Sequence, residues 1–327
     1  MQSLRLLCQS KGAGKLRKMR PSALRTIYQR PHGFRRTERG KSEKDARAVK
    51  GVERKVYAEK KKNNDAEIVK ESYNKNAQLE WERLEGFHFE FEIAKHYLKK
   101  YLRGKTVLDI GGGPGRYSVW LAKQGYDVTL VDLSENNIAL AKQKFQEYGV
   151  QVKAYVCDAR DLSALDLSIF DNVLIMGPLY HLSDVEDRKK CVLEAKKHLA
   201  KDGILFTSFI TLTAGLNYYL DTAPEQLIHE PAMDLFDRME RDESWSGMAF
   251  TQATFINSLE VLPFFDELGF EKLALLGQEG LTGPRLTKIE NSDEEVRKTY
   301  LEISLRVCEN PQYYAYSNHL LYIGKAK

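Results

Sequence analysis

The chain has 327 residues, of which 43% are hydrophobic and 10% aromatic, a composition that supports a sizeable core and excludes global disorder. Its formal net charge of +4 is unevenly distributed: residues 1–62 carry 20 Lys and Arg against 5 Asp and Glu, whereas residues 63–327 carry 30 against 41. No apolar stretch approaches the roughly 18 residues of a membrane-spanning helix, so we expect a soluble protein without membrane association.

The four cysteines, at positions 8, 157, 191 and 308, form no C-x-x-C pair, and the histidines form no cluster at metal-ligand spacing. A disulfide scaffold and a zinc knuckle both depend on such spacing. We therefore expect reduced thiols in a cytoplasmic protein and no metal site.

The basic segment, residues 1–62, has no acidic residue before Glu38. Its apolar residues keep no helical period over two turns, so we expect a disordered or loosely helical arm that the fold does not need. Three interpretations stay open: an organelle-targeting segment, a cationic arm that binds RNA or another anionic surface, or sequence upstream of the true start. The acidic balance of residues 63–327 argues against RNA.

Residues 63–327 are expected to form one α/β domain in which helices open the chain and strands then alternate with helices. Helices are predicted at 66–84, 87–101, 116–124, 135–148 and 183–198, and strands at 105–110, 127–132, 152–157, 172–176 and 203–210. Ser183 and Glu186 have the spacing of a capping box. The alternation predicts a doubly wound, mostly parallel, Rossmann-like sheet with a helical N-terminal cap.

The alternation stops after residue 210. The segment 211–250 is aromatic and irregular in pattern and exceeds an ordinary connection in length, so we expect a lid insertion there. The remaining predicted elements are a helix at 254–268, a strand at 270–276, a helix from a Ser292-x-x-Glu295 capping box to about residue 308, and a last strand at 319–323.

The strongest local signal is VLDIGGGPG at residues 107–115, a buried strand that runs into a glycine-rich turn before a helix. Gly111 permits a tight turn, and Gly113 lets a ligand approach the backbone closely. The next strand ends in Asp132, whose carboxylate can bind both ribose hydroxyls, and the third strand ends just before Asp158. Singly, each acid could be a capping or turn residue, but together they predict a nucleoside site.

Neither common phosphate-binding loop fits this sequence. The G-x-G-x-x-G pattern has Arg116 or Ser118 in place of its last glycine, depending on the register, and no G-x-x-x-x-G-K-[ST] occurs. Asp109 directly before the glycines would add negative charge beside a pyrophosphate. It suits a ligand that carries a positive amino group.

These motifs resemble motifs I, II and III of the class I S-adenosylmethionine-dependent methyltransferases, over roughly residues 66–327. The resemblance implies a seven-stranded sheet with an antiparallel last strand, S-adenosyl-L-methionine as the methyl donor and S-adenosyl-L-homocysteine as the product. The cofactor-binding residues that it implies are Asp109, Gly111, Gly113, Asp132, Leu133, Asp158, Ala159 and Met176. Asp132 would hold the ribose, with Leu133, Asp158 and Ala159 near the adenine.

The fourth predicted strand ends in MGPLYHL, residues 176–182, where the family places the methyl-accepting group. Methyltransferases of base amines have a side-chain oxygen where this chain has Gly177, so base methylation is disfavoured, and the segment resembles bacterial small-molecule enzymes. His181 is the candidate general base, although a packed histidine would give the same pattern. Tyr180, His181 and Tyr73 are the candidate substrate-binding residues.

We therefore expect a methyltransferase that moves a methyl group from S-adenosylmethionine to an O or N atom of a small-molecule acceptor. Two alternatives stay open: an RNA methyltransferase that uses the basic arm, and a non-enzymatic nucleoside-binding module on the same fold. The sequence leaves the oligomeric state undetermined.

Overall fold

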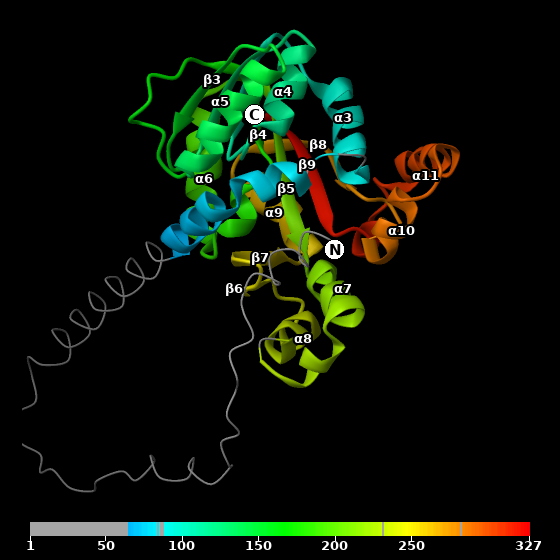
Figure 1. Cartoon of the computed structure of the whole chain (residues 1–327). Helices are drawn as coiled ribbons and strands as arrows, with labels where there is room; N and C mark the ends of the chain where they lie inside the picture. The colour runs from blue at the N-terminus through cyan, green and yellow to red at the C-terminus, as the bar shows by residue number, and fades with distance from the viewer. Residues whose placement is uncertain (1–64, 84, 86–87, 231, 282) are drawn as a thin grey trace, which may run out of the picture.

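The computed structural model describes residues 65–83, 85, 88–230, 232–281 and 283–327 (Figure 1). The basic arm predicted over residues 1–62 lies outside the described residues. Among the described helices, none combines the length and the apolar character that crossing a membrane requires.

In the described part of the chain, one nine-stranded sheet organises the domain. Its parallel part has the order β3-β2-β1-β4-β5, made by β1 (Thr106–Ile110), β2 (Asp127–Asp132), β3 (Val152–Val156), β4 (Phe170–Ile175) and β5 (Leu199–Thr211). The strand order reverses between β1 and β4, so a crevice opens beyond the carboxyl ends of these two strands. The doubly wound, mostly parallel architecture is confirmed.

Two strands near the C-terminus complete the far edge of the sheet. β9 (His319–Ala326) pairs antiparallel with β5 and with β8 (Phe270–Gly277). The predicted antiparallel last strand is confirmed. Because β9 runs against β5, its first residue, His319, lies opposite Ile210 near the carboxyl end of β5.

The predicted number of seven strands is wrong, because a hairpin of β6 (Trp245–Met248) and β7 (Gln252–Ile256) adds two. β5 has 13 residues and extends beyond the end of β4, which has 6. β7 pairs in parallel with the last residues of β5, whose other edge is already bonded to β9. The expected helix start at residue 254 is wrong for the same reason: α9 (Ser258–Glu267) begins after the strand, where the Asn257 side chain accepts from the Leu259 N–H.

Helices cover both faces of the sheet: a helix over residues 65–83, α3 (Phe89–Tyr101), α4 (Arg116–Lys123), α5 (Glu135–Glu147), α6 (Val185–Lys197) and α11 (Glu294–Val307). The two predicted capping boxes are wrong by one residue. Asp184, rather than Ser183, caps α6 by accepting from the Glu186 N–H, because the Ser183 hydroxyl donates to Asp65 instead. Asp293, rather than Ser292, precedes α11, because the Ser292 hydroxyl donates to Lys288 O.

The segment 211–250 is not irregular but mostly helical. It contains α7 (Leu212–Thr222), the 3-10 turn η2 (Pro224–Ile228), α8 (Ala232–Glu240) and β6. Its apolar residues form a separate cluster with Phe255 of β7, and Figure 1 shows α7 and α8 beside β6 and β7, away from α3 and α4. The C-terminal region adds η3 (Gly283–Arg285), α10 (Leu286–Glu290) and η4 (Pro311–Tyr316).

The alternation of side chains along the strands divides the core between two faces. Leu108 and Ile110 of β1 pack into one hydrophobic cluster, whereas Val107 packs into the other. Asp109 shares the face of Val107 and is fully buried. On the opposite face, Phe265 of α9 stacks on Tyr322 of β9, with the ring centroids 3.8 Å apart.

Candidate active site

One cavity lies at the carboxyl ends of β1, β2, β3 and β4, and the helix 65–83 also lines it. The predicted site residues on its wall are Tyr73, Gly111, Gly113, Asp132, Leu133, Asp158, Ala159, Met176, Tyr180 and His181. Asp109 is the exception, since it is not on the wall. Residues up to 108 positions apart in sequence are therefore brought together at the switch point of the sheet.

The glycine loop has two distinct structural requirements. Gly111 has a φ of +67°, and a Cβ on it would stand 2.2 Å from Cγ of Pro178, so this glycine allows the β1 and β4 turns to touch. Gly113 has a φ of +59°, and a Cβ there would meet only the Asn137 side chain, at 3.9 Å. The open space beside Gly113 belongs to the cavity, which fits a ligand that lies against this backbone.

Asp132 ties the loop to the end of β2. One carboxylate oxygen accepts from the Gly113 N–H at 2.9 Å, and the other accepts from the Ser134 N–H at 2.9 Å and the Asn137 amide at 3.1 Å. Burial raises the pKa of Asp132, although these three donors oppose the shift. A carboxylate oxygen has capacity for a further donor, so this side chain can bind a ribose hydroxyl at the cavity wall.

Asp158 is held by a residue that the sequence did not indicate. Arg160 grips its carboxylate through Nε and Nη2, the latter at 2.6 Å, and reaches Asp187 of α6 at 3.0 Å with Nη1. Burial opposes ionisation, but the Arg160 bonds outweigh it and lower the pKa of Asp158. The sequence signal that could have predicted this pair is the arginine two residues after the acid.

Asp109 lies behind the loop instead of on the cavity wall. The Ser118 hydroxyl donates to its Oδ2 at 2.7 Å, and its buried Oδ1 has no hydrogen-bond partner among the described residues. Burial raises the pKa of Asp109 to about 7. Its predicted contact with the cofactor stays a prediction.

The turn after β4 is a 3-10 turn, η1 (Pro178–His181), which projects Tyr180 and His181 into the cavity wall. A Cβ on Gly177 would lie 2.9 Å from the Gly111 carbonyl oxygen. Close packing against Gly111 therefore requires a glycine at this position. As a consequence, residue 177 offers no side-chain oxygen to a substrate.

His181 is bonded at both ring nitrogens. Nδ1 lies 2.9 Å from Gln252 O, and Nε2 lies 2.8 Å from the Tyr73 hydroxyl. A carbonyl oxygen only accepts, so Nδ1 carries the proton, and in the neutral ring Nε2 accepts from Tyr73. Burial lowers the pKa of His181 to about 4, which keeps the imidazole neutral at physiological pH.

The helix 65–83 closes one side of the cavity and contributes Tyr73. Its Asn74 accepts from the Ser134 hydroxyl at 2.6 Å and from the Asn136 N–H at 3.2 Å, while Asp65 accepts from Ser183. These bonds anchor the helix to the loops after β2 and β4. None of the described residues in 211–250 is on the cavity wall, and a lid function for that segment stays a prediction.

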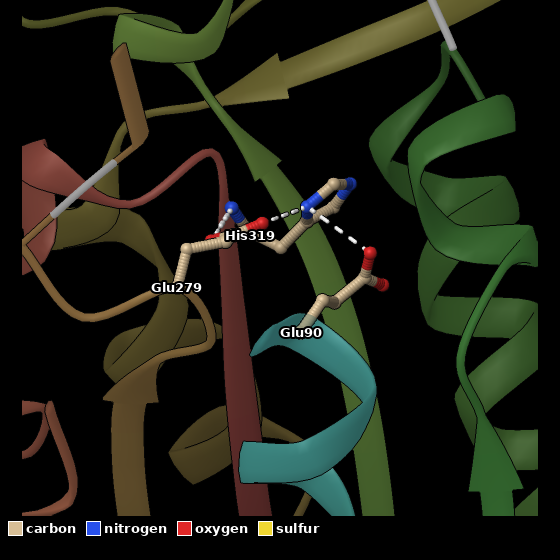
Figure 2. Close-up of side chains that lie close together, drawn as sticks. All are labelled: Glu90, Glu279 and His319. Carbon is tan, nitrogen blue, oxygen red and sulfur yellow. Dashed lines mark hydrogen bonds and ion pairs between the residues drawn. The ribbon is translucent and has the colours of Figure 1, made fainter. Parts of the chain in front are cut away.

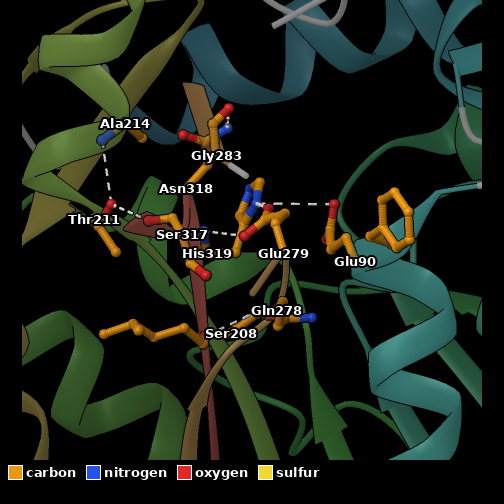
Figure 3. A network of polar contacts seen from close by, with 12 residues as sticks. Glu90, Ser208, Thr211, Ala214, Gln278, Glu279, Gly283, Ser317, Asn318 and His319 are labelled. Carbon is orange, nitrogen blue, oxygen red and sulfur yellow. Dashed lines mark hydrogen bonds and ion pairs between the residues drawn. The ribbon is translucent and has the colours of Figure 1, made fainter. Parts of the chain in front are cut away.

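Four charged side chains also lie on the wall: Arg83, which the sequence places on the first helix, and three that sequence reasoning missed, Glu80, Glu90 and Arg116. Arg83 bonds both carboxylate oxygens of Glu80. Glu90 faces His319, which is bonded to Glu279 (Figure 2). Figure 3 shows that His319 belongs to a polar network extending through Ser317 and Asn318 to Thr211 and Gly283.

Comparison with known proteins agrees with this geometry. A family model described as "Methyltransferase domain" matches residues 107–203. The ubiquinone biosynthesis O-methyltransferase of Chromobacterium violaceum is 30% identical over 176 residues, which cover 48% of this chain and 74% of that protein. The protein of the same name from Xylella fastidiosa is 37% identical over 113 residues, which cover 34% of this chain and only 44% of the relative.

Among solved structures, the 1,6-didemethyltoxoflavin-N1-methyltransferase of Burkholderia thailandensis has the same fold, with a TM-score of 0.52 at 15% identity. The superposition covers 81% of this chain and 90% of that one. The fold, the glycine loop and the acids after β2 and β3 define an α/β nucleoside-binding domain of the methyltransferase type. The chain belongs to the class I S-adenosylmethionine-dependent methyltransferases.

Proposed function

We propose that this chain transfers the methyl group of S-adenosylmethionine to an O or N atom of a small-molecule acceptor. The observation that carries the proposal is the meeting of two sets of residues in one cavity: Gly113 and Asp132 on one side, Tyr73 and His181 on the other. The names of the relatives, an O-methyltransferase of ubiquinone biosynthesis and an N1-methyltransferase, support both accepting atoms.

The residues at the end of β1 and β2 fit the nucleoside part of the cofactor. Asp132 has oxygens that can accept from ribose hydroxyls, Leu133 offers an apolar contact to a base, and Gly113 leaves space beside the backbone. When bound, S-adenosylmethionine supplies a methyl carbon that its sulfonium charge already activates. The protein then has to align the acceptor and provide a route for a proton.

The hydrogen-bonded pair of Tyr73 and His181 is placed to contact the molecule that receives the methyl group. The Tyr73 hydroxyl donates to His181, so its oxygen can accept a hydrogen bond from the O–H or N–H group of the substrate that is to be methylated. An imidazole with a pKa of about 4 is a weak base, and its Nε2 is already bonded to the Tyr73 hydroxyl. We therefore propose that His181 orients Tyr73, and that alignment contributes more than proton removal.

Calorimetric titration of S-adenosylhomocysteine into the full chain tests the cofactor assignment. We expect micromolar affinity, about −8 kcal/mol. Incubation with radiolabelled S-adenosylmethionine and a library of phenols, catechols, amines and carboxylic acids, with RNA as a further acceptor, then tests the reaction.

Absence of binding would overturn the proposal at its first step. Binding without transfer to any acceptor would favour the non-enzymatic nucleoside module, and transfer to RNA alone would favour the RNA methyltransferase. Transfer to one small-molecule class would establish both the activity and the accepting atom.

A further inference from the structure

Three side chains from separate parts of the sequence converge beside the cavity. Glu90 comes from the first turn of α3, Glu279 follows the end of β8, and His319 opens β9. One ligand atom from each lies within 4.8 Å of the other two. Figure 2 shows both carboxylates directed toward the imidazole of His319.

Two carboxylates approach Nδ1 of His319, and each can form an ion pair with the protonated imidazole. Glu279 Oε1 lies 2.6 Å from this nitrogen, and Glu90 Oε2 approaches the same nitrogen at 3.8 Å. A single N–H accounts for the first carboxylate only, because 3.8 Å is beyond hydrogen-bond distance. Two carboxylates and one imidazole nitrogen around a common point are also a ligand set for a divalent cation, which would take the place of the imidazole proton.

We propose that Glu90, Glu279 and His319 bind one first-row divalent cation such as Mn²⁺ or Zn²⁺. Two carboxylate oxygens and one imidazole nitrogen form a mixed oxygen and nitrogen donor set. Such a set suits Mn²⁺ or Zn²⁺ better than Mg²⁺ or Ca²⁺, which prefer oxygen ligands alone. Ligands about 2.1 Å from a tetrahedral ion stand about 3.4 Å apart. To reach that spacing, the 2.6 Å between Glu279 Oε1 and His319 Nδ1 has to widen, and the 3.8 Å between Glu90 Oε2 and the same nitrogen has to shorten.

Glu279 and His319 already lie side by side. The second oxygen of Glu279 accepts from the His319 backbone N–H at 3.0 Å, and the Glu279 side chain is 1% exposed. The loop behind it is tightly packed, because the Ser317 hydroxyl donates to Gly280 O at 3.0 Å. Two ligands that are already adjacent before the ion arrives lower the ordering cost of binding.

The third ligand connects the cluster to the cavity. Glu90 is on the cavity wall, and the Tyr180 ring, also on the wall, lies 6.5 Å from the His319 ring. The nearby cation of Arg83 is bonded to Glu80. The remaining coordination positions of an ion would therefore face the cavity, where they could bind an acceptor oxygen. This last step rests on the proposed function, whereas ion binding itself does not.

The test is titration of the chelator-treated, full-length protein with MnCl₂, monitored by the electron paramagnetic resonance signal of free Mn²⁺, and with ZnCl₂ by calorimetry. We expect one equivalent to bind, and we expect Glu90→Gln, Glu279→Gln and His319→Asn each to weaken binding at least tenfold. Glu92→Gln is the matched control. Glu92 lies on the same helix but pairs with Lys95 at 2.7 Å, outside the cluster, so its removal should leave the affinity unchanged.

Each variant is checked for folding by circular dichroism and by its affinity for S-adenosylhomocysteine, so loss of the ion site is distinguished from loss of the cofactor site. If Glu279→Gln does not fold, Glu90→Gln on the cavity wall still decides the outcome. The proposal is overturned if neither ion binds up to millimolar concentration. It is also overturned if Glu90→Gln and Glu279→Gln bind the ion as strongly as the unsubstituted protein does. Either result would leave His319 as a protonated ion-pair partner only.

Discussion

The Tyr73 hydroxyl lies 2.8 Å from Nε2 of His181, joining the helix 65–83 to the turn after β4. The two rings meet edge to face, with centroids 5.3 Å apart. Because Nδ1 is committed to Gln252 O, the bond from Tyr73 satisfies the other nitrogen of a buried ring. The covering helix and the strand β7, which carries Gln252, are thereby coupled through one imidazole.

Replacing Tyr73 by Phe should remove this donor and leave a buried acceptor without a partner. We expect the free energy of unfolding to fall by about 1–3 kcal/mol, measured by urea denaturation at pH 7. Tyr155→Phe is the control, because Tyr155 is 40% exposed on β3 and its change should cost little. Equal losses in both variants would contradict a specific role for the Tyr73–His181 bond.

The depressed pKa of His181 predicts a loss of stability in acid. Its pKa is about 4 in the folded protein against 6.5 for the free side chain, so its contribution is present above pH 6.5 and is lost as the pH falls through 4. The maximum difference is about 3 kcal/mol. It should appear as a pH-dependent gap in unfolding free energy between wild type and His181→Asn over pH 4–6.5, and a constant gap would refute it.

Asp109 predicts the opposite pH dependence. Burial raises its pKa to about 7 from 3.8, so the folded state favours the protonated carboxyl. Its stabilising contribution is present below pH 4 and is lost as the pH rises through 7, at a cost on the order of 4 kcal/mol. Relative to wild type, Asp109→Asn should therefore gain stability between pH 5 and pH 8. This difference is compared pH by pH, since the His181 contribution has the reverse sign.

Asp132→Ala should weaken binding of S-adenosylhomocysteine by about 10–100-fold, because each hydrogen bond to a charged group contributes about 1.5–3 kcal/mol. Asp127→Ala is the matched control at the other end of the same strand, where the side chain is exposed. Calorimetry on both proteins decides the matter. Unchanged affinity in Asp132→Ala would mean that the cofactor assignment of this residue is wrong.

Gly113→Ala separates backbone strain from loss of the cavity. Gly113 and Gly149 have similar φ values, +59° and +64°, and both have open space at the Cβ position. Each alanine should destabilise the protein by roughly 1 kcal/mol through the left-handed backbone. Only Gly113→Ala should reduce affinity for S-adenosylhomocysteine, at least tenfold, since its methyl group enters the cavity. Equal affinities would place the ligand elsewhere.

The sequence by itself determined the parallel half of the fold. Apolar strands of five or six residues, each followed by a turn and an amphipathic helix, have few ways to bury both faces, so the order of elements from residue 105 to 210 was readable. The glycines and acids at strand ends were also readable, because the carboxyl ends of parallel strands meet at one edge. The hairpin β6–β7 was not, since its pairing depends on how far β5 extends beyond β4.

Only the tertiary structure decided which side chains share the cavity and in what state. The pairing of Tyr73 with His181 joins residues 108 positions apart, and the position of His319 opposite Ile210 follows from antiparallel pairing rather than from any local pattern. Asp109 matched the family motif in sequence, but the alternation of side chains along β1 directs it behind the loop. Long-range contacts and burial set the pKa values of these groups, and neither quantity is encoded in the spacing of residues along the chain.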